Sequence, residues 1–131
     1  MATVLVIDDQ MELRTLFQRV LENQGHSVFC ACNGDHALRS TESWTPDLIL
    51  LDLAMPEMDG LAYLRIIRAR PGWADVPVIM LSGLMSHEQT RAAEELGVCD
   101  QLLKGEFSTR ELRARVAKYL KPHNALTGTA A

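Results

Sequence analysis

Residues 48–60 read LILLDLAMPEMDG, and this stretch decides the fold. Its first four residues are apolar, which is typical of a strand buried on both faces of a parallel sheet. Asp52 comes where this strand ends, and Pro56 and Gly60 mark the turn that leaves it. Open α/β sheets carry their chemistry at the carboxyl ends of their strands, so Asp52 is a candidate functional residue. The alternative is an aspartate that only opens a turn.

Three further predicted strands, over residues 3–7, 78–81 and 101–103, also end in polar side chains. The polar residues that follow these strands are, in chain order, Asp8, Asp9, Ser82 and Lys104. Taken singly, the acidic pair is explained as a helix cap and the lysine as a surface residue. A polar group at the end of each of four strands in so short a chain instead indicates one shared site.

Strands and helices alternate along the chain. A further strand is predicted over residues 28–32, and helices are predicted over residues 10–23, 35–42, 61–69, 86–97 and 108–121. Five such units predict a parallel sheet with helices on both faces, and right-handed crossovers leave few topologies. We therefore expect a flavodoxin-like doubly wound α/β fold with strand order 2-1-3-4-5, which places Asp8, Asp9 and Asp52 together. Residues 1–121 are predicted to form one domain and residues 122–131 a tail or linker stub.

Composition narrows the class of protein. The chain has 131 residues, of which 47% are hydrophobic, and this fits a single domain with its own core. The net charge of −4 argues against nucleic acid as a direct partner, and no apolar run is long enough for a membrane helix. Because the first strand is predicted to begin at residue 3, we expect no signal peptide. Cys30, Cys32 and Cys99 are expected to be reduced core thiols, and the protein is expected in the cytoplasm.

The predicted cluster suggests a chemistry. Three adjacent carboxylates repel one another, and a hard divalent cation with oxygen ligands, above all Mg²⁺, would relieve that repulsion. The Lys104 ammonium and the Ser82 hydroxyl suit phosphoryl oxygens. A carboxylate can attack phosphorus and form an acyl phosphate, and Asp52 holds the central position for this role.

In these residues the chain resembles the receiver domain of two-component response regulators, in the style of the single-domain chemotaxis regulator. The resemblance covers residues 3 to about 121. The motifs that carry it are Asp8-Asp9, Asp52 followed by Met55-Pro56 and Asp59-Gly60, Ser82-Gly83, and Lys104.

The resemblance implies a mechanism for the site. It implies Mg²⁺ bound directly by Asp9, Asp52 and the backbone carbonyl of Ala54, and through water by Asp8. It also implies that Asp52 takes a phosphoryl group from a phosphohistidine on a sensor histidine kinase or histidine phosphotransfer protein. Ser82 and Lys104 would then grip that group, and the changed surface would bind a downstream target protein.

Three departures from the usual receiver pattern stand out. Gly105 follows the lysine where receivers usually carry proline, which leaves Lys104 less rigidly placed. Gln101 stands where receivers often carry Tyr or Phe, so the usual inward swing of an aromatic ring is excluded. Ala54 and Leu84 lie two residues beyond Asp52 and Ser82, and neither can orient an attacking water.

The favoured function is a phosphorylation-controlled binding module, which catalyses only its own phosphorylation and dephosphorylation, and the sequence leaves other functions to compare with it. One is the N-terminal receiver part of a longer regulator with an output domain, such as DNA binding. An aspartyl-phosphate phosphatase would need an acid/base aspartate where Ala54 stands. A flavin carrier would need a phosphate-binding loop where the Asp8-Asp9 pair would repel phosphate.

We expect a monomer. The resemblance to receiver domains implies the alternative, a phosphorylation-linked dimer through the fourth helix, fifth strand and fifth helix. The basic residues of the last predicted helix are a solvated face or a docking surface for an acidic partner; they are Arg110, Arg113, Arg115, Lys118 and Lys121.

Overall fold

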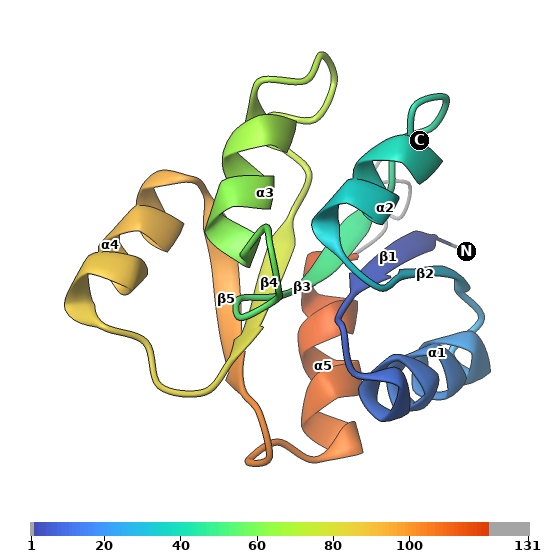
Figure 1. The fold of residues 1–131 in the computed structure, drawn as a ribbon. Helices are drawn as coiled ribbons and strands as arrows, with labels where there is room; N and C mark the ends of the chain where they lie inside the picture. The colour runs from blue at the N-terminus through green and yellow to red at the C-terminus, as the bar shows by residue number, and fades with distance from the viewer. Residues whose placement is uncertain (1, 121–131) are drawn as a thin grey trace, which may run out of the picture.

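The computed structural model of the chain describes residues 2–120, and the predicted tail at 122–131 lies outside them. Five strands alternate with five helices along these residues (Figure 1). The strands are β1 (Thr3–Ile7), β2 (Ser27–Ala31), β3 (Leu48–Asp52), β4 (Val78–Ser82) and β5 (Val98–Leu103). The helices are α1 (Met11–Asn23), α2 (Gly34–Ser40), α3 (Gly60–Arg68), α4 (His87–Glu95) and α5 (Thr109–Tyr119).

The sheet confirms the predicted topology. All four strand pairs are parallel, and the order is β2-β1-β3-β4-β5. The central strand β3 is buried along its whole length, as its continuous apolar run predicts. Its last residue is Asp52, and the last residue of β4 is Ser82, so both polar groups belong to the sheet itself.

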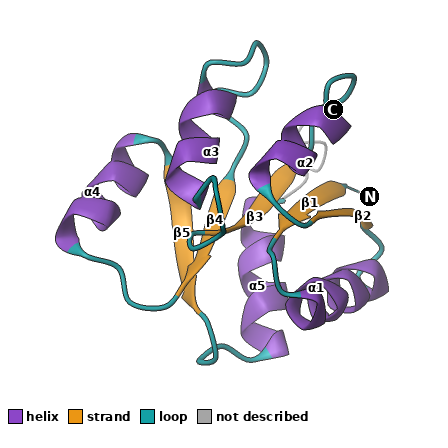
Figure 2. Ribbon diagram, in the orientation of Figure 1, coloured by secondary structure: helices purple, strands orange, loops and turns teal. Residues whose placement is uncertain are grey.

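Helices cover both faces of the sheet, and each face has its own core (Figures 1 and 2). Successive side chains of a strand point to opposite faces, so the strands divide their apolar residues between the two cores. On one face, Leu5 and Leu51 pack with α3 residues such as Leu64. On the other, Val6 and Leu50 pack with residues of α1 and α5. The two cores fix the strand ends relative to one another.

Strand β5 is longer than predicted. It begins at Val98, three residues before the start expected at Gln101. The register jumps from Val78 opposite Val98 to Ile79 opposite Asp100, so Cys99 is an extra residue in a bulge. The first half of this strand is not predicted from the sequence, because the bulge and the acidic Asp100 interrupt the apolar pattern that indicates a strand. A bulge on an edge strand is a common arrangement.

The cysteines differ in part from expectation. All three are free thiols, and Cys30 and Cys99 are partly buried, but Cys32 is exposed just beyond the end of β2. Separately, across residues 2–120 we find no helix with the length and apolar character needed to cross a membrane.

Arg68, near the C-terminal end of α3, joins three segments on the α3–α4 side. Its Nε donates to the carbonyl of Leu96 at 2.8 Å. Its Nη1 donates to the carbonyls of Trp73 and Val76, each at 2.9 Å. These carbonyls lie in the turn after α4 and in the connection from α3 to β4. The guanidinium therefore links α3 to the segments that precede β4 and β5.

Replacing Arg68 by Met is expected to lower the free energy of unfolding by about 2 kcal/mol, because several partly buried carbonyls lose a charged donor. Chemical denaturation of wild type and variant measures this difference. Arg65→Met, on an exposed position of the same helix, is the matched control and is expected to change stability little. Equal effects of the two substitutions would contradict the role given to Arg68.

Candidate functional site

The sheet brings all five predicted side chains to one edge. Asp8 is 0% exposed, Asp52 1% and Ser82 3%, whereas Asp9 is exposed and the Lys104 side chain is 23% exposed. One carboxylate oxygen from each of Asp8, Asp9 and Asp52 lies within 4.8 Å of the other two. The predicted acidic cluster is therefore present. Asp8 and Asp52 are buried at strand ends, and Asp9, the residue after Asp8, reaches solvent.

The hydrogen bonds of the buried acids are incomplete. Asp8 Oδ1 accepts from the Gln10 amide at 2.8 Å, and Asp52 Oδ1 accepts from the Ala54 amide at 3.3 Å. Asp52 Oδ2 and Ser82 Oγ are buried and have no hydrogen-bond partner among residues 2–120. Buried polar atoms are normally satisfied, so these two oxygens are where a ligand would be expected to bind.

Lys104 spans the buried acids. Its backbone N–H donates to the Ser82 carbonyl at 2.7 Å, which fixes the main chain beside β4. Its Nζ lies 3.0 Å from Asp52 Oδ1 and 3.3 Å from Asp8 Oδ2. Burial alone would lower the pKa of the ammonium, but its hydrogen bonds and attraction to Asp52 and Asp8 outweigh burial and raise the pKa. Lys104 is therefore fully charged at neutral pH.

The same surroundings favour the charged form of Lys104 but disfavour the charged form of Asp52. Burial raises the pKa of this carboxyl from 3.8 to about 6. The hydrogen bond from Lys104 lowers the pKa, and the charge of Asp8 raises it again. A carboxylate held in this way is costly to keep ionised, so a second cation beside it would be favourable.

The loop after β3 is shaped by close backbone packing. A Cβ at Gly60 would lie 2.5 Å from the backbone oxygen of Asp52, so the first turn of α3 requires glycine there. Asp59 caps α3 by accepting from the Ala62 amide at 2.8 Å. Glu57 has a φ of 72° in a tight turn closed by the Met58 amide and the Pro56 carbonyl at 2.7 Å. This loop therefore carries strain directly after Asp52.

The departures at Gly105, Ala54 and Leu84 have visible consequences. Gly105 has a φ of 79°, which proline cannot adopt, so this chain follows a path after Lys104 that proline would forbid. Ala54 is exposed and carries no polar group at the edge of the site. Leu84 is 95% exposed, so its side chain does not cover the buried acids.

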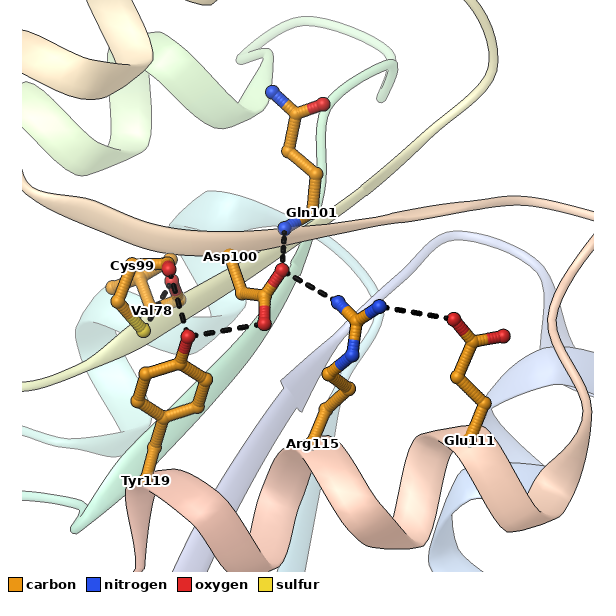
Figure 3. A network of polar contacts seen from close by, with 7 residues as sticks. All are labelled: Val78, Cys99, Asp100, Gln101, Glu111, Arg115 and Tyr119. Atoms are coloured by element: carbon orange, nitrogen blue, oxygen red, sulfur yellow. Dashed lines mark hydrogen bonds and ion pairs between the residues drawn. The ribbon is translucent and has the colours of Figure 1, made fainter.

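Gln101 is exposed on β5. Figure 3 shows its side chain extending away from a polar network on the other side of β5. In that network Asp100 accepts from Arg115 at 2.6 Å and from the Tyr119 hydroxyl at 3.0 Å, and Arg115 also donates to Glu111 at 3.1 Å. Arg115 is thus neutralised within its own domain, and the basic face predicted for α5 is smaller than the sequence implied. Lys121 of that face lies outside the described residues.

Sequence reasoning missed two contributors. Arg14 donates to the backbone carbonyl of Asp8 at 2.7 Å, and the Gln10 side-chain oxygen accepts from Lys104 Nζ at 3.2 Å. Gln10 occupies the N-cap of α1 but forms no side-chain cap there. A glutamine at a position that favours Ser, Thr, Asp or Asn was the available signal.

The donor set fits a divalent cation. Three carboxylates with oxygens close together, one of them exposed, suit an ion that prefers oxygen ligands and keeps some of its water. The unpartnered Asp52 Oδ2 supplies a free ligand atom for such an ion or for a phosphoryl group.

Comparison with known proteins points the same way. The sequence profile described as the response regulator receiver domain matches residues 4–117. The chain is 36% identical over 127 residues to the KDP operon transcriptional regulatory protein KdpE of Escherichia coli K12, a match that covers 97% of this chain and 55% of KdpE. The chain spans about half the length of several curated relatives that it matches.

Solved structures share the fold. The chemotaxis protein CheY4 of Vibrio cholerae superposes with a TM-score of 0.85 at 27% identity, covering 91% of this chain and 98% of CheY4. The receiver domain of the sensor histidine kinase PA1611 of Pseudomonas aeruginosa superposes with a TM-score of 0.81 at 27% identity, covering 92% and 98%. That structure has a magnesium ion coordinated in its active site cleft. With its family profile, its sheet order and its strand-end acids in agreement, this chain belongs to the response regulator receiver domains of two-component systems.

Proposed function

We propose that this chain is a phosphoacceptor module in which Asp52 receives a phosphoryl group from a phosphohistidine. The observation that carries the proposal is the Asp52 side chain, buried at the end of the central strand with Oδ2 unpartnered among the described residues. The proposed residues of the site are Asp52, Ser82 and Lys104 for the phosphoryl group and Asp8, Asp9, Asp52 and the Ala54 carbonyl for Mg²⁺. Residues 1–121 would form the module, and residues 122–131 a tail or linker.

The transfer balances without any further reactant. An Asp52 carboxylate oxygen forms a bond to phosphorus while the phosphorus–nitrogen bond of the donor breaks, and the ring, protonated on its other nitrogen, leaves with the electron pair as neutral imidazole. Lys104 would move from Asp8 to the phosphoryl oxygens, and the unpartnered Ser82 hydroxyl would donate to another. Bound Mg²⁺ would supply positive charge that offsets the charge on the transferring group. The magnesium in the PA1611 receiver supports this assignment.

A direct test is the intact mass of the protein after treatment with a small acyl phosphate and Mg²⁺. Wild type is expected to gain one base-labile phosphoryl group, and Asp52→Asn is expected to gain none, because an amide is not a nucleophile here. Omitting Mg²⁺ is expected to suppress the gain. Equal labelling of the Asp52→Asn protein would overturn the assignment.

Mg²⁺ binding is expected to centre on the three strand-end acids. Titration followed by amide chemical shifts should move the signals at Asp8, Asp9 and Asp52 first. Asp9→Ala is expected to weaken binding at least about tenfold, because a direct ligand is lost. Glu42→Ala, an exposed acid at the opposite end of the sheet, is the control and should leave the affinity unchanged. An unchanged affinity in Asp9→Ala would contradict the proposed ligand set.

The relatives favour a second candidate for the whole protein. Because this chain spans 55% of KdpE, it is equally suited to be the receiver part of a longer regulator with an output domain. The phosphodonor would be a sensor histidine kinase or histidine phosphotransfer protein, and the target either a separate protein or that output domain. Sequencing the gene beyond the codon for residue 131 decides between them.

A further inference from the structure

We propose that Gln10 is a positioning residue that holds the Lys104 ammonium in place, a role that rests on the proposed phosphoacceptor function of the site. Lys104 Nζ lies close to three oxygens. It donates a hydrogen bond to Gln10 Oε1 at 3.2 Å and forms ion pairs with Asp52 Oδ1 at 3.0 Å and Asp8 Oδ2 at 3.3 Å. Gln10 supplies the only uncharged oxygen of the three.

The hydrogen bond from Lys104 to Gln10 differs from the two ion pairs because its acceptor is uncharged. Asp8 and Asp52 carry the oxygens that the proposed cation and phosphoryl group would use, so Lys104 must give up at least part of its contact with them. Gln10 Oε1 does not compete for either ligand. Lys104 can therefore keep this hydrogen bond in the metal-free protein and in the phosphorylated protein alike.

Gln10 itself is held firmly at its backbone. Its N–H donates to Asp8 Oδ1 at 2.8 Å, and its carbonyl accepts from the Arg14 amide at 3.1 Å as α1 begins. As the N-cap residue it is placed where a short polar side chain would bond the helix, yet its longer side chain makes no such bond. The side chain reaches across to Lys104 instead, 94 residues away in the sequence.

The need for such a contact follows from the segment after Lys104. Gly105 has a φ of 79° and an unfilled space where a side chain would lie, so neither proline nor packing stiffens the chain there. The neighbouring Phe107 ring stacks on Phe17 of α1, with ring centroids 5.8 Å apart. This stack holds α1 and the Lys104 loop at a fixed separation, and Gln10 uses that separation to orient the lysine side chain.

The test compares substitutions that separate the hydrogen bond from the helix cap. Gln10→Met keeps the length of the side chain and removes the acceptor. Gln10→Asn keeps an acceptor that is too short for Lys104 but well suited to cap α1. Both are expected to slow phosphorylation by a small acyl phosphate about fivefold to tenfold, the size of one ordinary hydrogen bond, because the Gln10 side chain is exposed to solvent. Gln10→Asn is expected to do so without any loss of stability.

Two controls make the result specific. Gln101→Met, the same change at an exposed position of β5, is expected to leave the rate unchanged. In a Lys104→Ala background, Gln10→Met is expected to have no further effect, because the residue acts through the lysine. An equal slowing by Gln10→Met in that background would overturn the proposal, as would a normal rate in both Gln10 variants.

A metal-free measurement is independent of phosphorylation. The ¹⁵N-labelled Nζ group of Lys104 is expected to give a resolved NMR signal in wild type that broadens in Gln10→Met and Gln10→Asn and persists in Gln10→Glu. If wild type accepts no phosphoryl group but these signals behave as expected, the proposed function fails while the Gln10–Lys104 contact stands. Identical Lys104 signals in all four proteins would overturn the contact itself.

Discussion

At neutral pH and without Mg²⁺, the Asp52→Asn protein is expected to be more stable than wild type by about 3 kcal/mol. The reason is the cost of ionising a carboxyl group whose pKa is raised from 3.8 to about 6 by burial, against the opposing pull of Lys104. Asparagine has nearly the same shape and carries no charge, so it removes that cost. Asp52, the proposed phosphoacceptor, is thus expected to lower the stability of the folded protein.

The stability difference between Asp52→Asn and wild type is expected to depend on pH. Above about pH 6 the Asp52 side chain is ionised in both folded and unfolded chains, and the folded state bears the full cost. As the pH falls from 6 towards 3.8, the folded chain takes up a proton that the unfolded chain does not yet bind, so wild type gains stability relative to the variant. Below 3.8 both states are protonated and the difference should vanish.

Denaturant unfolding at several pH values, with a chelator present, measures the effect. Asp9→Asn is the matched control, because Asp9 is exposed and its change should have a much smaller effect. A difference between Asp52→Asn and wild type that stays constant from neutral to acid pH would contradict the explanation. Saturating Mg²⁺ should narrow the gap, because it stabilises only the ionised cluster.

The sheet order and the composition of the site were accessible from sequence for a simple reason. Parallel strands that are buried on both faces have unbroken apolar sequences, and the polar residue that follows such a run indicates the carboxyl end of the strand. Asp52 and Ser82 lie where this rule placed them, each as the last residue of its strand. Lys104 follows β5 and reaches back over the same edge.

Other features were not accessible because they depend on contacts between distant segments. The start of β5 was missed because Cys99 forms a bulge and Asp100 finds its partners on α5. The apparent basic face of α5 was overestimated, since periodicity cannot show that Arg115 is already paired. The contact between Gln10 and Lys104 needs the full fold, because no local pattern relates the start of α1 to the end of β5.

Once formed, the Asp52 phosphate is expected to persist in this protein at least about tenfold longer than in its Ala54→Asn variant, because hydrolysis needs an aligned water. The backbone N–H of Ala54 already donates to Asp52 Oδ1 at 3.3 Å, so a side chain at this position begins at the edge of the site. A methyl group there offers no hydrogen bond to a water. An asparagine amide would supply one.

Two features of the structure bear on the size of this effect. Leu84 is 95% exposed and does not cover the site, so a long lifetime would have to come from the missing water contact rather than from shielding. The free backbone at Gly105 acts in the opposite direction, because a loosely held Lys104 stabilises the phosphorylated form less. Water alignment should prevail, since the Lys104 side chain retains its contact with Gln10.

The measurement is the decay of phosphorylated protein after the donor is removed, followed by intact mass. Glu57→Asn is the matched control: it places the same amide in the same loop, at an exposed position whose φ of 72° asparagine tolerates well. Its decay should match wild type, because residue 57 does not contact Asp52 through its backbone as residue 54 does. If Ala54→Asn decays no faster than wild type, the side chain at position 54 does not control the lifetime. If Glu57→Asn accelerates decay as much as Ala54→Asn, the effect belongs to the strained loop as a whole and not to the alignment of a water.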